Sequence, residues 1–206
     1  MIVGLVLAAG ASTRMGTPKA SLPLAGGHTV LSKGVASLLA AGLPRVIVVV
    51  GAHAETVVGA LRTRDRRVEV VVHPRWADGQ LSSMLAGLAV AEQAEAVLEA
   101  VLVTLVDVPL VSPATTRAVI AAWRASRASL VRPARGVEHG HPVLFDRAIL
   151  DEVRRADPAV GLKAVIRAHE ADIVNVEVSD EGAFADLDTP ADYARLVGAL
   201  GSGHEN

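Results

Sequence analysis

The sequence predicts an α/β fold in which helices cover both faces of a mostly parallel β-sheet. β-Branched runs alternate with Ala- and Leu-rich segments at helical spacing, as in successive βα units. The chain has 206 residues, of which 51% are hydrophobic and 20% charged, enough apolar surface for one domain with a large core. Aromatic residues make up 2% and cysteine is absent, so the core is aliphatic and neither disulfides nor thiolate metal sites contribute. We expect a single domain over residues 1–200 and a frayed polar tail over residues 201–206.

The elements follow from the apolar patterns in order. Seven apolar runs predict strands over residues 2–7, 45–50, 68–72, 101–106, 129–132, 142–145 and 173–178. Between them, helical spacing predicts helices over residues 29–41, 54–64, 82–91, 113–126, 147–154, 162–169 and 190–200. Ser112 and Thr189 each precede a proline and are expected to be N-caps.

Charge and hydropathy exclude several classes of partner. The chain has 20 basic and 22 acidic residues and no block of Lys and Arg residues, so a nucleic-acid partner is not expected. The first nine residues imitate a signal-peptide core, but no Lys or Arg precedes the apolar run, which fits a buried first strand better. No window has the roughly 18 to 20 uninterrupted apolar residues of a membrane span. We therefore expect a soluble, cytoplasmic protein with no membrane partner.

The loop after the first strand has the chemistry of a phosphate cradle. Ligands of such sheets bind at the carboxyl ends of the strands, where this loop begins. Successive N–H groups can form an anion-binding nest, and Arg14 and Lys19 add positive charge. The loop matches neither the Walker pattern nor G-x-G-x-x-G, and a flexible turn with two solvated cations is the alternative. The residues expected to bring the backbone close to a ligand are Ala8, Ala9, Gly10 and Ser12.

Carboxylates follow two other segments. Asp107 ends the apolar strand over residues 101–106, and Pro109 keeps that strand from continuing. Mg²⁺ typically takes one or two carboxylates and leaves its other positions to water and substrate phosphates, so Asp107 is a candidate ligand; a cap or turn is the alternative. Asp186 and Asp188 either complete this metal site or cap the C-terminal helix, and the sequence leaves both open for Asp188.

Two smaller groups complete the candidate site. In the loop before the third helix, Gly79 permits close approach, while Gln80 and Ser83 can hydrogen-bond a base edge; a solvent loop capped by Ser82 is the alternative. His139 and His141 would share one face of an extended segment. No third ligand of matching spacing exists, so a zinc site is not expected, and His141 is interpreted as lining a pocket or as a merely hydrogen-bonded histidine.

The segment L-A-A-G-x-S-x-R-M-G-x-P-K resembles the N-terminal signature of the molybdenum cofactor nucleotidyltransferases. The segments G-H-P-V and D-x-D-T-P-x-D resemble their cytidylyltransferase branch, and W-x-x-G-x-x-x-S-L resembles their base-recognition loop, with Met84 in place of the usual Leu. Lys163 stands where members often have an arginine near the acceptor phosphate. The resemblance implies a three-layer, Rossmann-like nucleotidyltransferase fold with one antiparallel strand, most naturally residues 142–145.

The same resemblance implies an activity. It implies Mg²⁺-dependent transfer of CMP from CTP, or of another nucleoside monophosphate, to the phosphate of molybdopterin, with release of pyrophosphate. Arg14, Lys19 and Asp107 would be catalytic, with Asp107 as the metal ligand. A molybdoenzyme client would be a further partner. The alternatives are a sugar-phosphate or other small-alcohol-phosphate nucleotidyltransferase, and a non-catalytic maturation factor for a molybdoenzyme.

Overall fold

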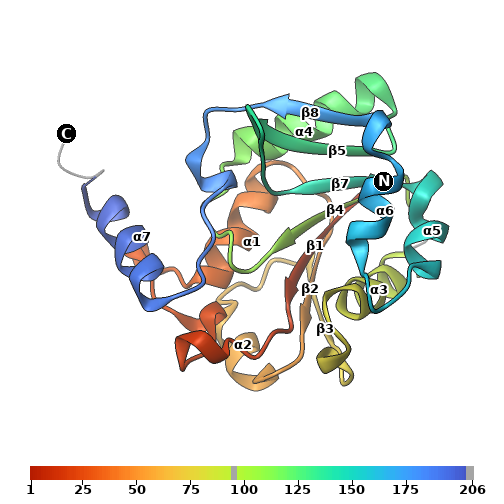
Figure 1. Ribbon diagram of the computed structural model, residues 1–206. Coiled ribbons are helices and arrows are strands. Elements are labelled where there is room, and N and C mark those ends of the chain that lie inside the picture. Colours follow the sequence, from red (N-terminus) through yellow and green to blue (C-terminus); the bar gives the residue numbers. More distant parts are fainter. Residues whose placement is uncertain (94–96, 203–206) are drawn as a thin grey trace.

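A computed structural model describes residues 1–93 and 97–202 of the chain and contains an eight-stranded sheet in that part (Figure 1). Its order is β3-β2-β1-β4-β7-β5-β6, and β8 pairs with β5. β7 lies antiparallel between β4 and β5, which confirms the prediction for this segment, and β6 is a second antiparallel strand that the sequence did not predict. The strands are β1 Ile2–Ala8, β2 Val46–Val50, β3 Val68–Val72, β4 Ala100–Leu105, β5 Leu130–Arg135, β6 Glu138–His139, β7 Val143–Asp146 and β8 Ile173–Glu177.

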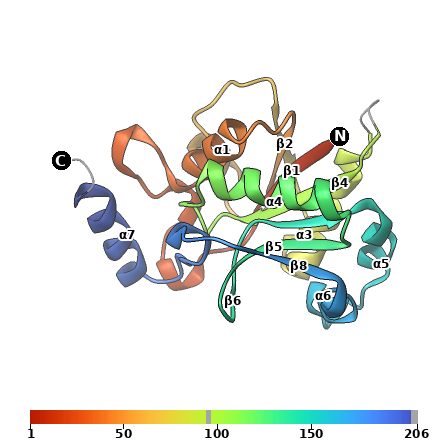
Figure 2. The same cartoon turned by 90° about the horizontal axis from the view of Figure 1, so that it is seen from above.

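Helices cover both faces of this sheet, as predicted (Figure 2). One core lies between the sheet and α1, α2 and α4, and a second lies between the sheet and α3, α5 and α6. α7 packs to the side, against the segment that follows β1. The helices are α1 Val30–Ala40, α2 Ala54–Ala60, α3 Gln80–Ala91, α4 Pro113–Ser126, α5 Leu150–Arg155, α6 Leu162–Ala168 and α7 Pro190–Ser202.

Continuous apolar strands result from burial on both faces. Every residue of β1 and β2 is buried, because helices cover the sheet from both sides where these strands lie. β1 pairs in parallel with β2 and with β4, so the carboxyl ends of all three strands meet at one edge of the sheet. The loops that follow these ends are therefore brought together.

Several helix boundaries differ from the predictions. α5 begins at Leu150 rather than at residue 147, because residues 147–149 form a 3₁₀ turn. α2 ends at Ala60 rather than at residue 64, because Arg62 takes a left-handed conformation with φ 48° and its guanidinium donates to the Gly27 carbonyl at 2.8 Å. The charged residues beyond it have no apolar face to bury. α3 begins at Gln80, two residues early, so Ser82 lies inside the helix and does not cap it.

Both predicted N-caps are present. The Ser112 hydroxyl accepts a hydrogen bond from Thr115 N at the start of α4. At α7, Thr189 Oγ1 accepts from Asp192 N at 3.2 Å, and the Asp192 carboxylate accepts from Thr189 N at 2.6 Å, which is a reciprocal capping box. Asp188 is therefore not the cap of this helix.

The C-terminal tail falls mostly beyond this description. Residues 201 and 202 are the last two of α7, and residues 203–206 of the tail expected to fray lie outside the described residues. No helix within residues 1–93 and 97–202 is both long and apolar enough to cross a membrane.

Candidate active site

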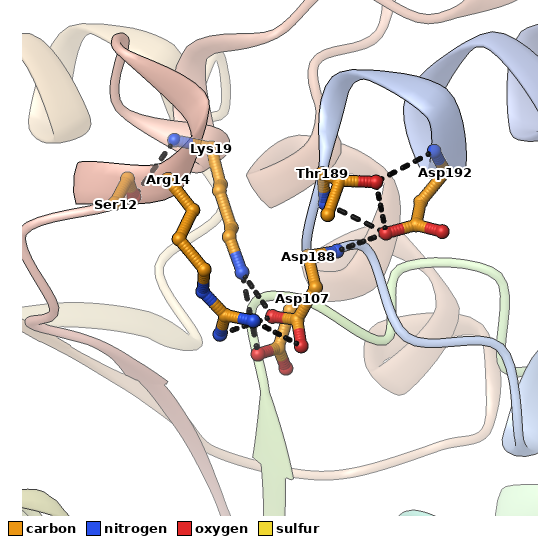
Figure 3. Close-up of polar contacts among 7 residues, drawn as sticks. All are labelled: Ser12, Arg14, Lys19, Asp107, Asp188, Thr189 and Asp192. Carbon is orange, nitrogen blue, oxygen red and sulfur yellow. Dashed lines mark hydrogen bonds and ion pairs between the residues drawn. The ribbon is translucent and has the colours of Figure 1, made fainter.

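The loop after β1 has a defined conformation rather than that of a flexible turn. Ser12 adopts a left-handed conformation with φ 53°, a 3₁₀ turn over Thr13–Met15 follows, and Gly16 has φ 67°. The backbone N–H of Lys19 donates to Ser12 Oγ at 3.0 Å and closes the loop (Figure 3). Only the exposed Arg14, with 65% of its side chain accessible, fits the alternative of a solvated cation, because the Lys19 side chain is 9% exposed.

The ammonium group of Lys19 lies between two carboxylates from distant segments. Its Nζ donates to Asp188 Oδ1 at 2.7 Å and lies 3.8 Å from Asp107 Oδ2. Arg14 holds Asp188 through two hydrogen bonds, of 3.0 and 3.1 Å, in a bidentate arrangement (Figure 3). The loop after β1, the end of β4 and the segment before α7 thus meet at one charged centre.

Burial and charge act on these carboxylates in opposite directions. Burial raises the pKa of Asp107, and the negative charges of Asp186 and Asp188 add to this while Lys19 opposes it. Burial, followed by the charge of Asp188, also raises the pKa of Asp186. The hydrogen bond from Lys19 lowers the pKa of Asp188, with Arg14 contributing in the same direction. Asp188 is therefore the carboxylate that neutralises the two cations.

Two neighbouring clefts contain most of the predicted site residues. The first cleft, of about 430 Å³, is lined by the loop after β1, by Asp107 and by the start of α3, and it includes Ala8, Ala9, Gly10, Ser12, Arg14, Lys19, Gly79, Gln80 and Ser83. The second cleft, of about 440 Å³, includes His141 and Lys163 together with Arg132 and His139. Gly79, Gln80 and Leu105 line both clefts, so the two are adjacent. Asp186 and Asp188 belong to the segment beside the first cleft.

Comparison with known proteins assigns the family. Residues 4–173 match the MobA-like NTP transferase domain. The chain belongs to this family. The nicotine blue oxidoreductase of Paenarthrobacter nicotinovorans is 31% identical to this MobA-like chain over 204 residues, 95% of this chain and 96% of that protein.

Solved structures resemble the MobA-like chain over nearly its whole length. Rv0371c from Mycobacterium tuberculosis is 29% identical, with a TM-score of 0.79 over 96% of this chain and 97% of that one. A nucleotidyl transferase from Methanothermobacter thermautotroptrophicus, Mth528, is 26% identical, with a TM-score of 0.82 over 99% of both chains. Another structure of Rv0371c, 28% identical to this chain, is a complex with manganese.

One carboxylate of the MobA-like chain has the environment of a metal ligand. Asp107 Oδ1 is buried and has no hydrogen-bond partner, although buried carboxylate oxygens are normally paired. The described residues contain no group of three or more His, Asp or Glu side chains placed to hold a metal ion. Mg²⁺ needs only one or two carboxylates when substrate phosphates and water complete its shell, so Asp107 fits this ion. Both oxygens of Asp188 are already hydrogen-bonded to cations.

Trp76 forms part of the wall of the first cleft and packs against Gly51. A Cβ atom added at Gly51 would lie 2.3 Å from Trp76 Cβ and 2.8 Å from the Ala9 carbonyl oxygen, so only glycine fits there. Gly51 therefore lies close to both the base of the Trp76 side chain and the backbone that follows β1. Trp76 is the first residue of the segment that resembles the base-recognition loop, but it was not predicted as a site residue, because its partner Gly51 follows a different strand.

The start of α3 is fixed by its neighbours. His73, which is buried after β3, has Nε2 2.8 Å from Ser82 Oγ in the first turn of α3. Ser83 is also buried, and its hydroxyl donates to the Gly79 carbonyl at 3.3 Å. Of the residues predicted to read a base edge, Gln80 therefore keeps its side-chain amide available.

Proposed function

We propose that this chain transfers CMP from CTP to the terminal phosphate of a molybdopterin-type acceptor and releases pyrophosphate. One observation carries the proposal: a buried lysine from a glycine-rich loop faces two carboxylates at the edge of the sheet, inside a cleft of about 430 Å³. Family membership supports nucleotidyl transfer as the class of reaction. The choice of CTP and of molybdopterin rests on the sequence segments that resemble the cytidylyltransferase branch.

The reaction needs positioned charge rather than a protein nucleophile. An oxygen of the acceptor phosphate attacks the α-phosphorus of CTP in line, and the bond from that phosphorus to the bridging oxygen of the β-phosphate breaks, so pyrophosphate leaves with the electron pair. Lys19 and Arg14 donate hydrogen bonds to the phosphate oxygens as negative charge develops on them. Both cations are held by Asp188 in the structure, and a triphosphate would replace this carboxylate as their anionic partner.

Asp107 would hold the magnesium ion, with Asp186 beside it. Bound there, Mg²⁺ would neutralise phosphate charge and orient the triphosphate. Asp107 contributes an unpaired buried oxygen, and Lys19 keeps the site from carrying several uncompensated negative charges. We assign Asp188 mainly to holding the cations, because its two oxygens are already engaged.

Base recognition is proposed for the wall that carries Gln80. A side-chain amide offers both a donor and an acceptor, which matches the cytosine edge with its amino group and ring acceptors. The methyl group of Ala9, in the loop opposite, narrows the cleft and should hinder a purine more than a pyrimidine. A site that pairs with one base edge rejects another strongly, because its polar groups would be left unpaired.

A nucleotide panel tests this function. The purified protein is incubated with Mg²⁺, molybdopterin and each of CTP, GTP, ATP and UTP, with pyrophosphate release and product mass as readouts. We expect the highest kcat/KM with CTP and the mass of a cytidylylated acceptor. A preference for GTP would move the assignment to guanylyl transfer, and transfer to sugar phosphates but not to molybdopterin would replace the acceptor. Absence of pyrophosphate with every nucleotide and acceptor would refute the reaction class.

A second candidate is reduction of an oxidised heteroaromatic compound. It is favoured by the name of the Paenarthrobacter relative and by the apolar second cleft that adjoins the nucleotide cleft. A dihydronicotinamide nucleotide would give a hydride to the compound, which would take a proton from solvent, so the nucleotide is oxidised and the compound reduced. Asp107→Asn separates the two functions, because hydride transfer needs no metal carboxylate while nucleotidyl transfer should be lost.

A further inference from the structure

Arg132 lines the second cleft without the partner that a half-buried cation normally has. Its Nε donates to Asn175 Oδ1 at 2.9 Å, across the β5–β8 pair. Among residues 1–93 and 97–202 no carboxylate lies within 4.0 Å of its guanidinium, and its terminal N–H groups have no acceptor. Burial lowers the pKa of Arg132, and the negative charge of Glu170 opposes this only in part and from beyond ion-pair distance.

Arg45 is the other half-buried arginine among residues 1–93 and 97–202, and it pairs with Glu69 at 2.6 Å. A charge taken out of water is costly unless it is paired. Arg132 lines a cleft, so an anion from outside the chain could satisfy its terminal donors.

The remaining charges of the second cleft are also positive on balance. Lys163 is exposed on α6 and lines the cleft, and its side chain makes no hydrogen bond or ion pair among the described residues. Burial lowers the pKa of His141 to about 4, so this ring is neutral at pH 7. The pKa of His139 is lowered too, first by burial and then by the charge of Arg132. Asp78, the carboxylate among the lining residues, lies 3.9 Å from Arg75.

Much of the lining is apolar. Val103, Val143 and Phe145 come from β4 and β7, and Leu162 and Ile166 come from α6. Phe145 is 2% exposed and forms part of the packed core, so this wall is rigid. The cleft thus offers two cations beside an apolar surface, in a volume of about 440 Å³.

We propose that the second cleft binds an anionic group carried on a largely apolar body, and that Arg132 is the residue that selects for this anion. Lys163 provides a second, weaker contact. This inference rests on the proposed function in one respect, because the ligand of the second cleft is taken to be the part of the acceptor that is remote from the reacting phosphate. The reacting end would then lie at Leu105, where the two clefts meet two residues before Asp107.

A pair of dyes tests the anion preference without any turnover. The compounds are 8-anilinonaphthalene-1-sulfonate and N-phenyl-1-naphthylamine, which share the apolar body and differ in the sulfonate. We expect the dye with the sulfonate to bind about tenfold more tightly than the dye without it, which is the effect expected of one hydrogen bond to a charged group. Arg132→Gln should remove this difference by weakening the sulfonate alone. Arg167→Gln, on the exposed side of α6 outside the cleft, is the matched control and should leave both affinities unchanged.

Two further variants control for a loosened contact with β8 and for dye binding in the first cleft. Lys163→Gln alters an exposed side chain, so it should fold normally and weaken the sulfonate to a smaller degree, even if Arg132→Gln loosens the contact with β8. Arg14→Gln in the first cleft should not affect either dye. Equal affinities of the two dyes, or a loss of sulfonate binding in Arg14→Gln but not in Arg132→Gln, would overturn the inference.

The transfer assay distinguishes this inference from the proposed function. Arg132→Gln should raise the KM for the acceptor about tenfold and leave the KM for CTP unchanged. If no nucleotide is transferred but the sulfonate preference depends on Arg132, the proposed function fails and the anion site stands. If transfer occurs but the dyes show no preference, the anion site fails alone.

Discussion

Replacing Lys19 with Met tests whether the buried ammonium group organises the site. Methionine keeps most of the buried stem and removes the charge that lies 2.7 Å from Asp188 and 3.8 Å from Asp107. Breaking a fully buried pair typically costs about 3–5 kcal/mol. Asp188 is 35% exposed and keeps Arg14 as a partner, so we expect a smaller loss of unfolding free energy, about 2 kcal/mol. For a chain of this size that corresponds to a fall in Tm of about 4–8 °C.

The effect of the same change on turnover should be larger than its effect on stability. Removing one preorganised donor from developing charge typically lowers kcat by about 10² to 10³. Pyrophosphate release at saturating CTP measures turnover, and urea unfolding measures stability. Lys33→Met, in α1, is the matched control, because the side chain of Lys33 makes no hydrogen bond or ion pair among the described residues. A folded Lys19→Met protein with the turnover of the parent would refute the role of Lys19.

Three other changes test separate parts of the structure. Asp107→Asn should weaken Mn²⁺ binding in a direct titration and raise the Mg²⁺ requirement of the reaction. It should not lower Tm, because burial raises the pKa of Asp107 and makes its charge costly. Mn²⁺ titrations that overlay those of the parent protein would exclude Asp107 as the ligand. Gly51→Ala should cost about 1–3 kcal/mol by overpacking, since the new Cβ would lie 2.3 Å from Trp76; Gly59→Ala in α2, with open space around it, should cost nothing. Burial raises the pKa of Asp180, but hydrogen bonds from the start of α4 outweigh burial and hold it below its usual value. The stabilising contribution of Asp180 is therefore present above about pH 4 and lost at lower pH. In urea unfolding, Asp180→Asn should lower the free energy of unfolding by about 2 kcal/mol at neutral pH and by little in acid. An equal loss at both pH values would contradict this.

Most of the sheet could be predicted because its central strands are buried on both faces. Such strands must be continuous apolar runs, and β1, β2 and β4 were predicted to within one or two residues. β6 has only Glu138 and His139, both exposed, so it leaves no pattern in the sequence. α2 was predicted too long because helical spacing continues past the point where apolar burial stops.

The site was predictable where topology alone brings residues together. Parallel strands place the loop after β1 beside the end of β4, so Lys19 and Asp107 were expected to meet. For Asp188 the sequence left metal binding and helix capping open. The Thr189–Asp192 box excludes capping, and the pairing of Asp188 with Lys19 and Arg14 was not predicted. Arg132 was missed because it is a single charge within an apolar strand, and whether it reaches a cleft depends on how α6 and β8 pack around it.

The position of Trp76 makes it an intrinsic fluorescence probe of the first cleft. The chain has two tryptophans. Trp123 is 1% exposed, its Nε1–H donates to Asp146, and it belongs to the core under α4. Trp76 stands in the wall of the first cleft, so a base entering there would meet its ring and alter its emission, while the emission of Trp123 should stay constant. Occupancy of the cleft can therefore be followed by intrinsic fluorescence in the absence of an acceptor.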